Sequence, residues 1–137
     1  MSSSRNLWGD IPVAENLLNS PRRLLQEQAD ILTAETKGKL VGELSSTFPN
    51  GKNFSVMLRI KVPSLQNYIF GVLKIEYPID LYPLKIVNHT LNELVSVTCN
   101  NDKEYEHELG TILRSDRVKQ VISALLSEVI ENVESEE

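Results

Sequence analysis

The single cysteine of the chain, Cys99, is the residue whose chemistry would matter most in an enzyme. A cysteine nucleophile needs a nearby base, and the 137 residues include only two histidines, His89 and His107. Cys99 shares its parity with Val95 and Val97 in an expected strand, so we expect it to point into the core. A single cysteine also excludes an internal disulfide and a zinc site built on paired thiols.

Motifs that bind phosphates, dinucleotides or catalytic metals are missing from the sequence. It contains no P-loop, no dinucleotide fingerprint, no zinc-protease motif and no nucleophile elbow. His107 lies between Glu106 and Glu108 on the polar side of an expected helix, without further ligands at metal-binding spacing. We therefore predict no catalytic residue, no metal site and no cofactor, and hence a protein that is not an enzyme.

The net charge and its distribution limit the kinds of molecule that we expect the protein to bind. The net charge is −5, and residues 102–137 alone carry −6. Nucleic-acid binding requires a basic field that neutralises phosphates, so we expect no nucleic-acid partner. No apolar run approaches 18 residues, and the first residues lead into no apolar signal sequence. We therefore expect a cytoplasmic protein without membrane contact.

The elements that must position the side chains follow from the hydrophobic spacing. Apolar residues recur with a helical period at both ends of the chain and with a period of two between them. This order predicts an α+β domain: an antiparallel four- to five-stranded meander, with an N-terminal helix and two C-terminal helices packed on its buried face. Residues 20–133 form the single domain, after an N-terminal arm (1–19) and before an acidic tail (134–137). The expected helices are 20–38, 101–113 and 115–133, and the expected strands are 40–48, 54–62, 67–77, 84–88 and 94–99.

Polar residues mark the expected ends of the helices. Ser20 can cap the first helix, with Pro21 at its first position, and Gly38 ends it. Asn101 and Ser115 stand where the second and third helices begin, so we expect them to be N-caps.

The outer face of the sheet is the predicted interaction surface. Strict alternation places Met57 and Arg59 on this face, beside Tyr68 and Phe70 of the next strand. An apolar face of this kind is covered either by the arm that contains Trp8 or by a second protein. The predicted partner-binding residues are thus Trp8, Met57, Arg59, Tyr68 and Phe70, and the partner is another protein or a second copy in a homodimer.

The end of the third expected strand carries a family resemblance. The pairs Tyr77-Pro78 and Tyr82-Pro83 resemble the proline-rich bend of RWD domains and of ubiquitin-conjugating-enzyme-like folds. The two prolines are five residues apart, where RWD domains show four, and Asn88-His89-Thr90 replaces the His-Pro-Asn stretch and the active-site cysteine of the enzymes. The resemblance therefore implies a shape and no conjugating activity.

Two further resemblances concern size and charge. The chain is similar to type III secretion chaperones, which are small, acidic, α+β and dimeric, although these proteins carry a helix where this chain has the bend from Pro78 to Pro83. It also resembles small bacterial proteins without an assigned activity. The predicted function is a non-enzymatic protein–protein interaction module of an adaptor, chaperone-like or immunity type. The alternatives are a secretion chaperone and an enzyme that uses Cys99.

Overall fold

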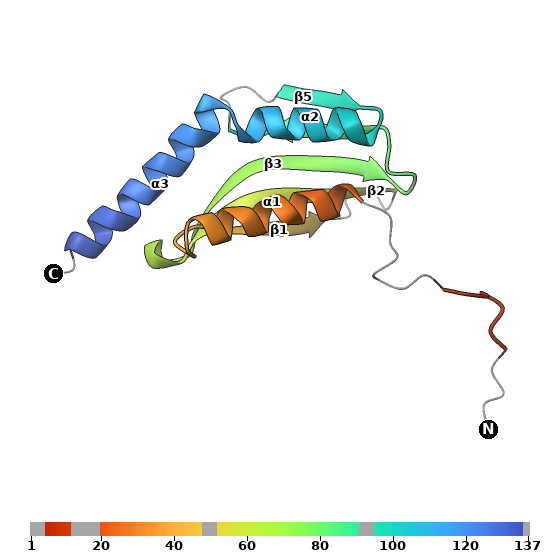
Figure 1. Ribbon diagram of the computed structural model, residues 1–137, viewed down its shortest axis with the longest axis horizontal. Coiled ribbons are helices and arrows are strands. Elements are labelled where there is room, and N and C mark those ends of the chain that lie inside the picture. Colours follow the sequence, from red (N-terminus) through yellow and green to blue (C-terminus); the bar gives the residue numbers. More distant parts are fainter. Residues whose placement is uncertain (1–4, 12–19, 48–51, 91–94, 136–137) are drawn as a thin grey trace.

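The predicted α+β architecture is confirmed by a computed structural model, which describes residues 5–11, 20–47, 52–90 and 95–135 (Figure 1). A five-stranded antiparallel sheet runs in the order β1-β2-β3-β4-β5, as a meander. One helix precedes the sheet and two follow it. The elements are α1 (Pro21–Glu35), β1 (Val41–Thr47), β2 (Asn53–Val62), a 3-10 turn η2 (Pro63–Leu65), β3 (Tyr68–Pro78), β4 (Leu84–Asn88), β5 (Val95–Cys99), α2 (Asp102–Leu113) and α3 (Asp116–Ser135).

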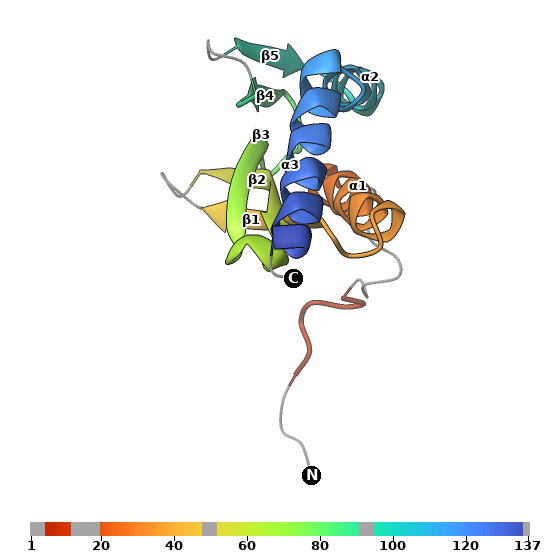
Figure 2. The same ribbon diagram turned by 90° about the vertical axis from the view of Figure 1, so that its left-hand side faces the viewer.

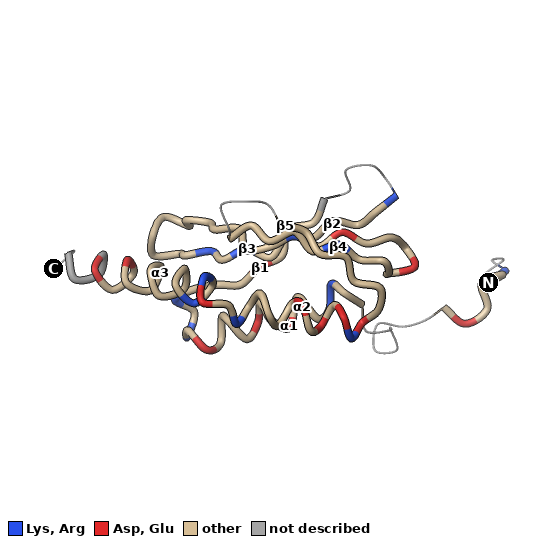
Figure 3. Tube along the Cα trace, turned by 90° about the horizontal axis from the view of Figure 1, so that it is seen from above, with Lys and Arg blue, Asp and Glu red and all other residues tan. Residues whose placement is uncertain are grey.

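The three helices of the described residues lie on one side of the sheet, and none of them covers the other side (Figures 2 and 3). α1 packs on β1, α2 packs on β5 and β4, and α3 runs from the end of α2 to η2. No helix among the described residues is long and apolar enough to cross a membrane. The meander therefore has one face covered by helices and an outer face that none of the described helices covers.

The predicted caps are confirmed at all three helix starts. The Ser20 hydroxyl accepts a hydrogen bond from the Arg23 N–H at 3.1 Å, and the Asn101 side chain accepts one from Glu104 at 2.9 Å. Ser115 accepts one from the Val118 N–H at 3.2 Å. These bonds satisfy N–H groups that have no partner within the helix, so each helix begins at a residue fixed by local sequence. α1 ends at Glu35, three residues before Gly38.

A β-bulge in β3 corrects the predicted face of Tyr68 and Phe70. Leu58 opposes Leu73 but Arg59 opposes Gly71, so Val72 is an extra residue in the ladder. Residues directly opposite in an antiparallel pair point to the same face. Phe70 and Tyr68 oppose Ile60 and Val62, which are buried under the helices. The prediction that these two aromatic residues share the outer face with Met57 and Arg59 is therefore wrong.

The position of α1 depends on a close backbone contact with β1. A side chain added at Gly42 would place its Cβ 2.6 Å from the Cα of Ala29, which overlaps the helix backbone. The Thr33 hydroxyl accepts a hydrogen bond from the Gly42 N–H at 2.9 Å and donates one to the Ala29 carbonyl at 3.1 Å. Glycine in β1 and threonine in α1 thus let the two backbones meet directly.

We expect Gly42→Ala to lower the free energy of unfolding by about 1–3 kcal/mol, because the new methyl group can fit only if α1 moves. Gly110→Ala is the matched control. Its Cβ would meet the far end of the Arg114 side chain, which can swing away, so this helical substitution should leave stability unchanged or raise it. Urea unfolding of both variants measures the difference; equal midpoints would show that the close contact does not fix α1.

Candidate binding groove

The five residues predicted to bind a partner lie in three separate places. Met57 and Arg59 are half-buried on the outer face of the sheet, while Tyr68 and Phe70 face the helices. Trp8 belongs to the arm, whose described residues 5–11 are all exposed and lie clear of the sheet in Figures 1 and 2. The structure therefore does not bring these residues together into one surface.

The outer face is more polar than strict alternation predicts. Arg59 pairs with Glu43 across two strands at 2.7 Å, and Lys74 lies 3.1 Å from Glu76 along β3. Without Tyr68 and Phe70, this face is left without an aromatic cluster among its described side chains. Charged side chains that are already paired on their own face make it a weaker candidate for a docking surface.

An apolar groove opens on the helix-covered side, between α1 and the end of α2 with the start of α3. Leu58, Ile60 and Val72 form its floor, so the groove reaches the central strands of the sheet. It has a volume of about 240 Å³. The side chains that form its walls are Gln28, Ala29, Ile31, Leu32 and Glu35 from α1, Leu113 from α2, and Val118 and Ile122 from α3.

The groove exists because α1 and α3 lie apart over the sheet. The contact at Gly42 holds α1 above β1, the edge strand. Arg117 in the first turn of α3 donates a hydrogen bond to the Thr90 carbonyl at 2.7 Å, which ties α3 to the end of β4 on the other side. Between these two contacts, only the side chains that form the groove walls cover the central strands of the sheet.

The chemistry of the groove suits an apolar ligand. Ile31 on the rim is 52% exposed, although it is a large aliphatic side chain. Gln28 and Glu35 are its only polar wall residues among the described lining. Two polar groups on one helix cannot surround and orient a polar substrate, whereas apolar walls and floor gain free energy by burying apolar side chains.

One sequence signal points to this groove. The face of α1 that carries Leu25 and Leu32 also carries Gln28, Ile31 and Glu35, and only part of this face is buried against the sheet. When the apolar face of a helix is wider than its contact with the sheet, side chains at the edge of that face, such as Ile31, stay exposed. The sequence shows that the apolar face of α1 is wide, but it does not show the distance between α1 and α3.

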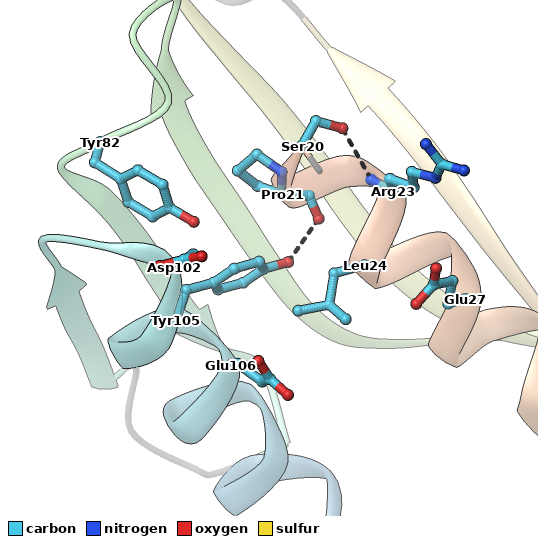
Figure 4. A pocket seen from close by; sticks show the side chains of 9 residues that line it. All are labelled: Ser20, Pro21, Arg23, Leu24, Glu27, Tyr82, Asp102, Tyr105 and Glu106. Carbon is cyan, nitrogen blue, oxygen red and sulfur yellow. Dashed lines mark hydrogen bonds between the residues drawn. The ribbon is translucent and has the colours of Figure 1, made fainter. Parts of the chain in front are cut away.

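A second, smaller pocket lies where α1 and α2 begin (Figure 4), and we call this place the junction because its side chains join the two helix starts. The buried Tyr105 hydroxyl donates a hydrogen bond to the Pro21 carbonyl at 2.8 Å, which joins the two helix starts. Tyr82 from the bend before β4 points into the same junction. Glu27, Asp102 and Glu106 line the opening with one cation, Arg23, so the net charge of the pocket is negative and disfavours an anion.

Cys99, the candidate nucleophile of the sequence analysis, belongs to the hydrophobic core. Cys99 is fully buried, and burial raises the pKa of its thiol, with further increases from Glu108 and Glu104. A raised pKa keeps the thiol protonated and so disfavours the nucleophilic thiolate. No group of three His, Cys, Asp or Glu side chains in the described part of the chain could hold a metal ion.

No protein-family model matches this sequence, and comparisons with curated proteins and with solved structures give no significant match.

Burial raises the pKa of Tyr105 above the ordinary tyrosine value of about 10, and Tyr82 and Tyr77 add to the shift. The folded state therefore keeps this proton after the unfolded chain has lost it. Its contribution to stability is complete below about pH 10 and decreases as the pH rises further. We expect Tyr105→Phe to cost about 0.5–1.5 kcal/mol at pH 7, through the lost bond to Pro21, and to flatten the loss of stability above pH 10.

Urea unfolding of the wild type and Tyr105→Phe between pH 7 and pH 11 tests this expectation, since lysine titration is common to both proteins. Parallel curves across the alkaline range would contradict the assignment of Tyr105 as the buried proton donor of the junction.

Proposed function

We propose that this chain is a non-enzymatic protein–protein interaction module whose binding site is the groove between α1 and α3. The observation that carries the proposal is the half-exposed Ile31 beside a floor of core residues, Leu58 and Ile60, that only the walls cover. Such an apolar surface favours a protein segment that brings apolar side chains. An adaptor, chaperone-like or immunity-type role in a bacterial cytoplasm belongs to the same proposal.

The shape of the groove favours a short helix or an extended segment as the ligand. The walls come from α1, α2 and α3 and the floor comes from the sheet, so side chains spaced along one face of a ligand can enter between the helices. Gln28 and Glu35 on the α1 wall can contact polar groups of the ligand backbone or a basic side chain. The proposed ligand is therefore an apolar protein segment with polar or basic flanks.

The alternatives gain less support. Type III secretion chaperones carry a helix between the third and fourth strands, and the chain between β3 and β4 here is a bend of five residues that includes a cis Tyr82-Pro83 bond. A Cys99 enzyme would need an accessible thiolate, and the thiol is buried with a raised pKa. The RWD-like resemblance concerns shape and is compatible with an interaction module.

Photocrosslinking tests the groove directly. A benzoylphenylalanine at position 31 should crosslink to the partner protein in cells, whereas the same residue at position 130 should not. Ile130 is the matched control because it is 50% exposed on α3 and does not line the groove. A third probe at position 57 reports on the outer face of the sheet.

The crosslinked protein is then purified and its affinity is measured by calorimetry. Ile31→Glu should weaken binding about tenfold or more, since a carboxylate would replace the apolar rim, and Ile130→Glu should bind like the wild type. Adducts that form at position 57 but not at position 31, or equal losses in both variants, would contradict the proposed site.

A further inference from the structure

The N-terminal arm carries the two most exposed large apolar side chains of the described residues, Leu7 and Trp8. Leu7 is 87% exposed, Trp8 is 83% exposed and Ile11 is 61% exposed. Burying a tryptophan side chain removes roughly 150–250 Å² of surface from water. While Trp8 is exposed, the protein does not gain the free energy of this burial. The arm would therefore gain free energy if its apolar side chains packed against an apolar surface.

A local turn organises this arm. The Asn6 side chain accepts a hydrogen bond from the Trp8 N–H at 2.9 Å and donates one to the Gly9 carbonyl at 3.0 Å. Gly9 adopts a positive φ of 70°, which glycine tolerates without strain. An ordered turn that presents Leu7 and Trp8 together loses less conformational entropy on binding than a random segment would.

The groove is complementary to this arm in composition and charge. Its walls and floor are apolar, and Glu35 is the only ionisable residue among the described lining. Arg5 stands two residues before Leu7, so an arm seated in the groove can bring a guanidinium toward this carboxylate. The same chain thus carries an unburied apolar segment and an unfilled apolar groove.

The described part of the arm does not fill the groove of its own chain, because residues 5–11 are all exposed and none of them lines the groove. The arm precedes the first residues of α1, whereas the groove is lined by its C-terminal half, from Gln28 to Glu35. In Figure 1 the arm leads away from that half of the helix.

We propose that the groove of each chain receives Leu7 and Trp8 of a second copy, which gives a two-fold symmetric dimer with exchanged arms. This inference rests on the proposed function, because it names an occupant of the same groove. Two-fold symmetry makes each copy both donor and acceptor, so every arm-to-groove contact occurs twice. A partner protein with an apolar segment would then compete with the arm of the second copy.

The test combines the oligomeric state with the fluorescence of Trp8, the only tryptophan of the chain. Sedimentation of the full chain over a range of concentrations should show a monomer–dimer equilibrium. Trp8 emission should shift to shorter wavelength in the dimer and return to longer wavelength on dilution. Trp8→Ser and Ile31→Glu should each weaken dimerisation by at least about tenfold, the effect of removing a central apolar anchor.

Ile130→Glu is the control variant and should dimerise like the wild type, because Ile130 lies outside the groove. A chain that stays monomeric with Trp8 exposed at every concentration would overturn the proposal. A monomer in which Trp8 is shielded at every concentration would overturn it in favour of the chain's own arm. A dimer that persists in both Trp8→Ser and Ile31→Glu would place the contact elsewhere and also overturn it.

The partner crosslink at position 31 separates this inference from the proposed function. If Trp8→Ser is monomeric and still crosslinks to a partner through position 31, both proposals stand. If the wild type is monomeric and still crosslinks there, the arm exchange fails and the binding groove stands.

Discussion

The arrangement of the helices depends on the direct contact between the backbones of α1 and β1. Gly42 has no side chain, and Ala29 of α1 occupies the space that one would need. Thr33 completes the contact by bonding to the backbone of both elements. Because α1 is held against the edge strand, it cannot also cover the central strands, and α3 is anchored on the opposite side through Arg117. The groove between them is the consequence of these two anchors.

The bulge at Val72 decides which face of the sheet can act as an interface. In a regular β3, Phe70 and Tyr68 would join Met57 and Arg59 on the outer face. The extra residue turns both aromatic side chains toward the helices and adds Val72 to the groove floor. The outer face keeps charged pairs such as Arg59–Glu43, whereas the helix side gains apolar surface. One inserted residue therefore moves the apolar surface available for binding from one face to the other.

The sequence predicts the parts of this structure that depend on local interactions. The caps at Ser20, Asn101 and Ser115 use hydrogen bonds within three residues, and the element order follows from the change of hydrophobic period. Alternation in β2 predicts its buried residues because no bulge interrupts that strand. In β3 apolar residues occupy both parities from 68 to 73, so alternation could not reveal the shift, although Gly71 is a residue type common at bulges. The groove was not predictable because it depends on the distance between helices that are about 80 residues apart in the chain.

Methyl-resolved NMR of the full chain over a range of concentrations tests most directly whether the groove, rather than the outer face, is the contact surface. We expect the resonances of Ile31, Leu113 and Ile122, which line the groove, to shift as the concentration rises. Resonances of Val41 and Met57 on the outer face should stay constant. Concentration-dependent shifts confined to the outer-face methyl groups would contradict the groove as the contact surface, and the absence of any shift at the groove would contradict the exchange of arms.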